Sequence, residues 1–322
     1  MATIQDIANE VGISKAAVSR ILNKKGSFSK DTIRKVYRVA REMGYTLPED
    51  IQAFEELDFK IIAAVLPLSN MAYYSMLASY LETAAYSYGY SLMICSSLFD
   101  SEKEEEFLNH LKERKINGII YGSFSEGVKI DDTLPIVTIG YQMSKQIPVI
   151  RSDNYMAGVL AAKHLASKNC KNILYISGYQ AGNHRDKRYL GLRESSKELG
   201  LNIKAYFTED YDGKKNIESI ISNMFVENPQ ADGLFAESYT LAVKCLQVAN
   251  NLGIKVPEQI KIIGYGNDSL SEYTYPKLSY IKENTELIAQ KAIAQLVDMI
   301  EGNQVLTNES IIPVSIEQNQ TT

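Results

Sequence analysis

The chain has 322 residues and a net charge of −5, and its 45% hydrophobic and 23% charged residues are typical of a globular protein. This length predicts one small module and one larger domain of two lobes. No apolar run approaches the roughly 18 residues that a membrane span needs, and no basic and apolar leader is visible, so we expect a soluble, cytoplasmic protein.

The cysteines and histidines are scattered along the sequence. Cys95, Cys170 and Cys245 follow one another at intervals of 75 residues, which is neither a disulfide framework nor a metal-ligand spacing. The sequence therefore predicts three reduced, mostly buried thiols, no metal site and no cofactor.

The charges are distributed unevenly. The first 45 residues contain nine lysines and arginines and four acidic residues, a net charge of +5, so the remainder of the chain sums to −10. A basic head on an acidic body is typical of a protein in which only the head meets DNA phosphates. A solvated basic face would give the same counts, so charge alone leaves both interpretations open.

The first 45 residues have the periodicity of three helices. Thr3 begins a capping-box pattern, Gly12 ends the first helix, and Ser14 can cap the second after a short turn. A third helix starts near Ser29 and ends at Gly44. The residues expected to face the core of this module are Ile4, Ile7, Ala8, Val11, Ala17, Val18, Ile21, Leu22, Ile33, Val36, Tyr37, Ala40 and Met43.

The outer face of the second helix has side chains suited to DNA. Arg20 can form a two-pronged contact with guanine, and Ala16 is small enough to meet a thymine methyl group. Lys15 and Ser19 suit phosphate oxygens. The spacing predicts a helix-turn-helix.

These residues closely resemble the head of LacI/GalR-type transcription regulators. The resemblance covers the whole module and rests on residues 3–8, 12–14, 17–23 and 44–45. It implies that Lys15, Ala16 and Arg20 read an operator, whereas the alternative is a helix-turn-helix that touches no DNA. The candidate DNA-contacting residues are Thr3, Ser14, Lys15, Ala16, Ser19, Arg20, Asn23 and Phe54.

Residues 46–59, the expected hinge, depart from the family pattern. Relatives have a basic hinge helix that ends in a leucine wedged into the minor groove. Here the segment contains five carboxylates, and Phe54 stands where the leucine is expected. Carboxylates repel phosphates, so we expect this hinge to bend DNA less than is usual for the family, although an apolar wedge at Phe54 can still kink it.

From residue 60 to 322, short apolar runs alternate with amphipathic stretches. The strand candidates include residues 61–66, 91–95, 118–121, 136–139, 173–176, 233–235, 260–264 and 311–316. The helix candidates include residues 74–88, 102–115, 156–167, 186–199, 214–225 and 241–252. This alternation predicts α/β lobes with parallel sheets that are covered on both faces.

The larger domain resembles the two-lobed, periplasmic-binding-protein-like sensor of the same family, over nearly all of residues 60–318. The resemblance implies a ligand cleft between the lobes, at the carboxyl ends of the strands. The candidate effector-contacting residues are Tyr73, Tyr74, Asp153, Arg188, Ser238, Tyr239 and Asn267.

Each of these residues also has a purely structural interpretation. One tyrosine of the Tyr73–Tyr74 pair can pack the following helix while the other stacks on a ligand ring. Arg188 can hold hydroxyls or a carboxylate, or form a surface salt bridge, and Asp153 can accept ligand hydrogen bonds or cap a helix. Ser238–Tyr239 replaces the usual Asn-Asp pair and Gly266 replaces a sugar-binding aspartate, so we expect a less acidic, more aromatic cleft.

Two other functional classes are disfavoured. An enzyme is possible on this fold, but the sequence has neither a dinucleotide or P-loop glycine motif nor a Gly-x-Ser-x-Gly elbow. A transport-associated solute-binding protein would share the sensor fold, but it would need export and would lack the basic head.

The sequence therefore predicts a homodimeric regulator on a palindromic operator, because one head of about 45 residues makes few DNA contacts. The family resemblance implies repression of a carbohydrate operon that a small sugar or sugar phosphate relieves. A non-sugar ligand or a partner protein is the alternative.

Overall fold

The structure, a computed structural model, describes residues 2–23, 25–45, 60–68, 72–113, 116–123, 128, 134–178, 186–208, 216–266, 274–303 and 307–322. It divides the chain into two compact units, Met1–Lys60 and Ile61–Thr322. The hinge predicted at residues 46–59, including Phe54, and the predicted effector contact Asn267 lie outside the described residues.

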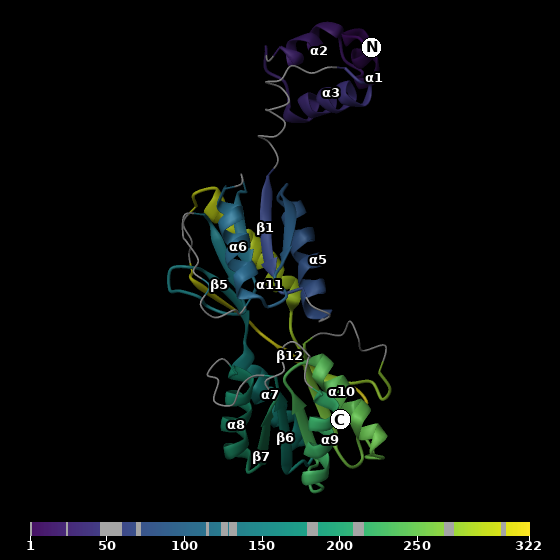
Figure 1. The fold of residues 1–322 in the computed structure, drawn as a ribbon, viewed down its shortest axis with the longest axis vertical. Coiled ribbons are helices and arrows are strands. Elements are labelled where there is room, and N and C mark those ends of the chain that lie inside the picture. Colours follow the sequence, from purple (N-terminus) through teal and green to yellow (C-terminus); the bar gives the residue numbers. More distant parts are fainter. Residues whose placement is uncertain are drawn as a thin grey trace. The chain divides into compact units, whose positions relative to one another are not determined.

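The helices that the structure describes in the first unit are α1 (Ile4–Val11), α2 (Lys15–Leu22) and α3 (Lys30–Glu42) (Figure 1). The predicted capping box is present, and Gly12 follows α1 with a φ of 81° that favours glycine. The buried core residues are Ile7, Ala8, Val11, Val18, Ile21, Leu22, Val36, Tyr37, Val39 and Ala40. Met43, predicted to be in the core, is exposed because it lies beyond the end of α3, and Val39 is buried instead.

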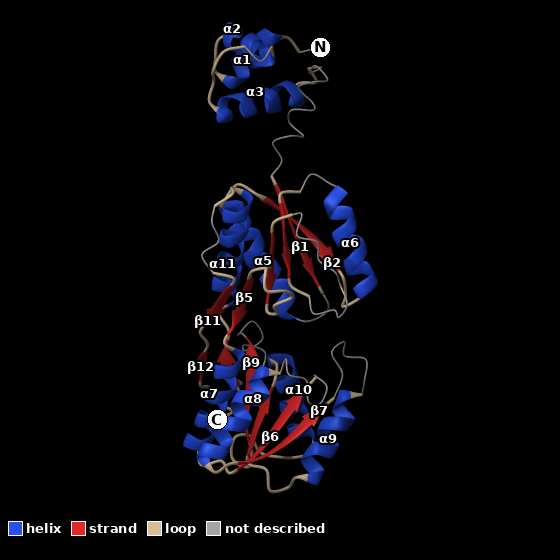
Figure 2. Ribbon diagram, turned by 90° about the vertical axis from the view of Figure 1, so that its left-hand side faces the viewer, coloured by secondary structure: helices blue, strands red, loops and turns tan. Residues whose placement is uncertain are grey.

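The second unit consists of two α/β lobes. The first lobe contains α5 (Ala72–Ser87), α6 (Ser101–Glu113) and α11 (Thr285–Ile300). Its sheet has the order β11-β5-β4-β3-β1-β2. The strands of this sheet are β1 (Ile61–Leu66), β2 (Ser91–Ser96), β3 (Gly118–Tyr121), β4 (Ile136–Ile139), β5 (Val149–Ser152) and β11 (Glu309–Ile312). Helices α5 and α11 pack on one face of β1, and α6 packs on the other (Figure 2).

The second lobe repeats this three-layer arrangement with the sheet order β12-β10-β9-β8-β6-β7. Its strands are β6 (Asn172–Ser177), β7 (Asn202–Phe207), β8 (Gly233–Ala236), β9 (Lys261–Gly266), β10 (Ser279–Lys282) and β12 (Ser315–Glu317). Its helices are α7 (Asn154–Ser167), α8 (Lys187–Leu199), α9 (Ile217–Glu227) and α10 (Tyr239–Asn251). Helices α9 and α10 cover one face of β6, and α7 and α8 cover the other. All paired strands are parallel except β10 and β12, which confirms the predicted fold class.

The chain passes between the lobes three times. It leaves the first lobe after β5, returns between β10 and α11, and leaves again between β11 and β12. The single strand predicted at residues 311–316 is therefore two strands in different sheets. Pro313 separates them, since proline has no N–H to donate to a sheet.

Three findings bear on the predictions from composition. The cysteines Cys95, Cys170 and Cys245 are all buried, as predicted. In the described part of the chain, no helix combines the length and apolarity needed to cross a membrane. The same residues contain no group of three or more metal-binding side chains.

Candidate functional site

Helix α2 presents one polar face to solvent. Lys15, Ala16, Arg20 and Asn23 are exposed and Ser19 is half-buried. The opposite face of α2 is buried in the core of the head. The five predicted contact residues on α2 and at its end therefore share a surface that a DNA groove can reach.

Hydrogen bonds fix α2 at both ends. The Ser14 hydroxyl accepts a bond from the Ala17 N–H at 3.1 Å, and the Tyr37 hydroxyl on α3 donates to the Ile21 carbonyl at 3.1 Å. The Thr3 hydroxyl accepts from the Asp6 N–H at 3.3 Å, and the Asp6 carboxylate accepts from the Thr3 N–H at 2.8 Å. The predicted contacts Thr3 and Ser14 thus serve as helix caps. Their contact with DNA is a prediction that these capping roles leave open.

In the second unit, side chains from both lobes meet at the carboxyl ends of the strands of the second lobe. We call this group the interlobe cluster, and its members are Tyr73, Ser152, Arg188, Glu237, Tyr265 and Glu283. Tyr73 and Ser152 come from the first lobe, on α5 and β5, and the others come from the second lobe. The carboxyl ends of parallel strands are the usual position of ligand sites in α/β folds.

Glu283 joins the lobes. Its side chain is only 8% exposed, and its Oε1 accepts a hydrogen bond from the Ser152 hydroxyl at 2.5 Å and from the Tyr265 hydroxyl at 2.9 Å. Ser152 precedes the first crossing between the lobes and Glu283 precedes the second. The carboxylate therefore connects two of the three crossing segments.

Arg188 lies in the middle of the cluster. Its guanidinium carbon is 4.2 Å from the centre of the Tyr265 ring, and its Nη1 donates to the main-chain carbonyl of Glu237. Burial, followed by the nearby Glu283 carboxylate, raises the pKa of Tyr73 well above its usual value, whereas Arg188 lowers it. The Tyr73 phenol is thus neutral at physiological pH and can donate a hydrogen bond.

Glu237 is a half-buried carboxylate. The Ser177 hydroxyl donates to its Oε2 at 2.6 Å, and the Gly178 N–H also lowers its pKa. Burial raises the pKa more than these bonds and Arg188 lower it, so the net shift is upward.

This shift predicts a pH dependence for the Glu237→Gln variant. The folded protein retains the Glu237 proton to a higher pH than the unfolded chain does. Glu237 therefore lowers the free energy of unfolding of the wild type as the pH rises above the ordinary glutamate range. We expect Glu237→Gln to gain stability relative to the wild type between pH 4.5 and pH 7, as measured by urea unfolding at each pH. An identical difference between the two proteins at both pH values would show that this carboxylate is not perturbed.

A close helix contact and a capping carboxylate set the position of Arg188. A Cβ atom on Gly158 of α7 would lie 2.0 Å from the Arg188 carbonyl oxygen, so only glycine permits this approach of α7 and α8. Asp186 caps α8 through the Tyr189 N–H at 3.0 Å and accepts a bond from the Tyr175 hydroxyl at 2.9 Å.

The other predicted effector contacts occupy different surroundings. Tyr74 is buried in the core of the first lobe, where its ring packs edge-on against Phe99. Asp153 caps α7 by accepting from the Met156 N–H at 2.9 Å, and Ser238 caps α10. Tyr239 is buried in the second lobe against Tyr280. Of the described candidates, the structure brings only Tyr73 and Arg188 together at the interlobe cluster.

Ser152, Glu237, Tyr265 and Glu283 were not among the predicted site residues. Glu237 and Tyr265 lie at or just beyond the ends of predicted strands, which was a signal that could have found them. Ser152 and Glu283 lie at the ends of β5 and β10, which the sequence did not predict. The sequence led us to expect few acidic groups in the cleft. The interlobe cluster contains two carboxylates, those of Glu237 and Glu283.

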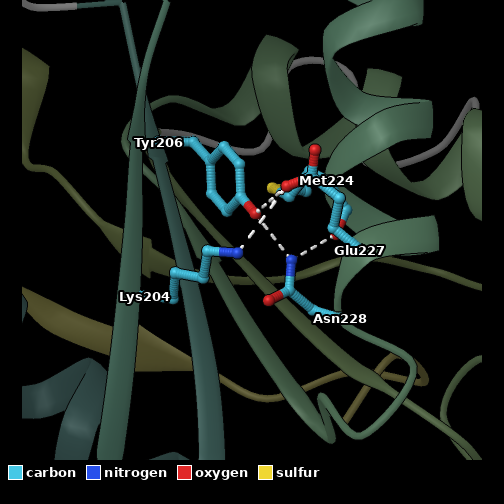
Figure 3. Close-up of polar contacts among 5 residues, drawn as sticks. All are labelled: Lys204, Tyr206, Met224, Glu227 and Asn228. Atoms are coloured by element: carbon cyan, nitrogen blue, oxygen red, sulfur yellow. Dashed lines mark hydrogen bonds and ion pairs between the residues drawn. The ribbon is translucent and has the colours of Figure 1, made fainter.

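The polar group in Figure 3 lies apart from these residues, at the edge strand β7. The Tyr206 hydroxyl donates to Glu227 Oε2 at 3.0 Å and accepts from Asn228 Nδ2 at 2.6 Å, and Lys204 Nζ lies 3.6 Å from the same Glu227 oxygen. These contacts fasten β7 to the end of α9. They stabilise the packing within one lobe and are not a second candidate site.

Comparison with known proteins identifies the family. The description "Bacterial regulatory proteins, lacI family" matches residues 3–47, and "Periplasmic binding protein-like domain" matches residues 162–322. The HTH-type transcriptional regulator DegA of Bacillus subtilis (strain 168) is 31% identical, over 87% of this chain and 86% of DegA. The chain belongs to the LacI family. This LacI-family protein is therefore a sequence-specific DNA-binding transcriptional regulator.

Two further comparisons concern the sensor and the whole chain. The sucrose operon repressor of Streptococcus mutans serotype c is 29% identical over 98% of each chain. A periplasmic binding protein/LacI transcriptional regulator from Alkaliphilus metalliredigens, solved in complex with D-xylulofuranose, is 29% identical with a TM-score of 0.73. The alignment covers 82% of this LacI-family chain and 99% of that one.

Proposed function

We propose that this regulator represses a carbohydrate-utilisation operon, and that a small sugar-like effector bound at the interlobe cluster lowers its affinity for a palindromic operator. The observation that carries the regulatory part is the exposed polar face of the capped helix α2. An aromatic ring, a guanidinium and hydrogen-bonding groups at the interlobe cluster are the groups that sugar sites use. No enzymatic reaction is part of this proposal.

Two comparisons support the proposal of a sugar-like effector. The relatives include a sucrose operon repressor, and a neighbouring structure holds D-xylulofuranose. The second candidate is a regulator that answers to a non-sugar ligand or a partner protein. A thermal-shift screen of sugars, sugar phosphates, nucleobases and amino acids separates the two, because only the proposed function predicts that a sugar raises the melting temperature.

Arg20→Ala tests the reading face. An operator is first selected from random DNA with the wild-type chain, and affinity is then measured by fluorescence anisotropy at fixed salt. We expect a loss of about 1–3 kcal/mol and a relaxed preference at one base position, since Arg20 would lose a two-pronged base contact. Arg38→Ala, an exposed cation on α3, is the control expected to keep the base preference. An unchanged affinity and preference in Arg20→Ala would remove Arg20 from the reading face.

We also propose a homodimer that uses the outer edge of the first lobe. β2 is an edge strand, and Ile94 on it is 43% exposed; Tyr86 and Tyr88 nearby in the chain are exposed as well. An exposed apolar edge next to unpaired backbone groups is typical of an association surface.

Ile94→Asp is therefore expected to shift the protein toward a monomer in light scattering after gel filtration, and to weaken operator binding because two heads no longer bind together. Leu199→Asp, at the end of α8 with 39% exposure, is the matched control. A dimer that persists in Ile94→Asp as it does in Leu199→Asp would place the interface elsewhere.

A further inference from the structure

Three neighbouring strands of the second lobe place Glu283, Tyr265 and Glu237 of the interlobe cluster in a row, and the next strand, β6, ends at Ser177. In the sheet order β10-β9-β8-β6, Glu283 follows β10, Tyr265 lies near the end of β9, and Glu237 follows β8. Because adjacent strands are about 4.8 Å apart, the two glutamates are separated by roughly 10 Å along the row. Arg188 stacks on Tyr265, between them.

Both carboxylates retain hydrogen-bonding capacity. Glu237 accepts from the Ser177 hydroxyl and the Gly178 N–H, and Glu283 accepts from the Ser152 and Tyr265 hydroxyls. A carboxylate can accept about four hydrogen bonds, so these described contacts use roughly half of the capacity of each group. Hydroxyl groups of a ligand can supply the remaining donors.

The charges along the row favour an uncharged ligand. A phosphate placed against Arg188 would lie between two carboxylates, and repulsion between like charges is strong in a partly buried site. Burial raises the pKa of Glu237, so keeping this carboxylate charged lowers the stability of the fold. Such a loss of stability is typical of residues that serve binding.

We propose that Glu237 and Glu283 accept hydrogen bonds from hydroxyl groups of the effector, and that this pair selects an uncharged, hydroxyl-rich ligand over its phosphorylated form. The inference rests on the proposed function, in which a sugar-like effector binds at the interlobe cluster. It goes further by naming the two residues that select the effector by its charge.

The test uses the purified full chain and titration calorimetry. Ribose, sucrose, cellobiose and xylulose are compared with ribose 5-phosphate, sucrose 6-phosphate, cellobiose 6-phosphate and xylulose 5-phosphate. We expect one uncharged sugar to bind at least about tenfold more tightly than its phosphate. Glu237→Gln and Glu283→Gln should each weaken binding of that sugar by roughly tenfold, because a hydrogen bond to a charged acceptor is lost. Each variant should also show a smaller difference in affinity between the sugar and its phosphate.

Glu198→Gln provides the matched control, since Glu198 is exposed on α8 and should change neither affinity. Circular dichroism spectra and melting curves confirm that the glutamine variants fold. A phosphate that binds as tightly as its parent sugar, or a preference that persists unchanged in both glutamine variants, would overturn this inference and leave a sugar effector in place. Binding of another ligand class, with no sugar or sugar phosphate bound, would overturn the proposed effector itself.

Discussion

Replacing Gly158 with alanine is expected to lower the free energy of unfolding by about 3 kcal/mol, because the new Cβ would meet backbone atoms. It would lie 2.0 Å from the Arg188 carbonyl oxygen and 2.4 Å from the Leu192 N, and neither atom can rotate away. Helices α7 and α8 must then separate. Urea unfolding of the wild type and the variant measures this loss.

The same substitution is expected to weaken effector binding at least tenfold, since Arg188 moves with the first turn of α8. Gly200→Ala is the control: a Cβ there meets no atom within 4 Å, and the variant bears only the strain of a φ of 66°, about 1 kcal/mol. If Gly158→Ala were as stable as Gly200→Ala and bound effector normally, the close α7–α8 contact would not position Arg188.

Arg188→Ala is expected to weaken effector binding by about 3 kcal/mol, or more than 100-fold, while leaving operator affinity without effector unchanged. The substitution removes the guanidinium that lies on Tyr265 and donates to the Glu237 carbonyl. It also leaves the Glu237 and Glu283 carboxylates without this neighbouring positive charge. Calorimetry with the effector and anisotropy with the operator measure the two affinities separately.

Arg193→Ala is the matched control for Arg188→Ala. Arg193 lies on the same helix and is exposed, with its guanidinium carbon 5.7 Å from the centre of the Tyr189 ring. We expect this variant to bind effector as the wild type does. If both variants lost effector affinity equally, the arginines of α8 would act on the effector only through their charge at long range, and Arg188 would make no specific contact with it.

The sequence predicted those elements of the fold whose pattern is local. The bounds of β1, β3 and β4 agree with prediction because each strand is a continuous apolar run. β5, β7 and β10 are not among the predicted strands. Arg151 and Lys204 interrupt the apolar patterns of β5 and β7, and β10 has only two apolar residues, Tyr280 and Ile281. Helix α11 is also absent from the predicted helices, although Ile288, Ala292 and Leu296 in it have helical spacing and are buried.

The site was predictable only where a residue follows a local pattern. The exposed face of α2 was foreseen from helical periodicity, because its period separates Arg20 from Val18 and Ile21. Glu283 could not be placed without β10, and Glu237 could not be matched with it without the order of the strands in the sheet. Tyr73 and Tyr74 illustrate the same limit, since adjacent tyrosines diverge into the interlobe cluster and the core.

Effector-controlled repression is tested most directly by fluorescence anisotropy with the full chain. DNA affinity is measured with and without saturating effector, on the selected operator and on a scrambled duplex. We expect a preference for the operator and a 5- to 150-fold loss of operator affinity on adding the effector, which corresponds to a coupling of about 1–3 kcal/mol. Equal binding to both duplexes would contradict sequence-specific recognition. An effector that tightens operator binding would contradict the proposed release of a repressor.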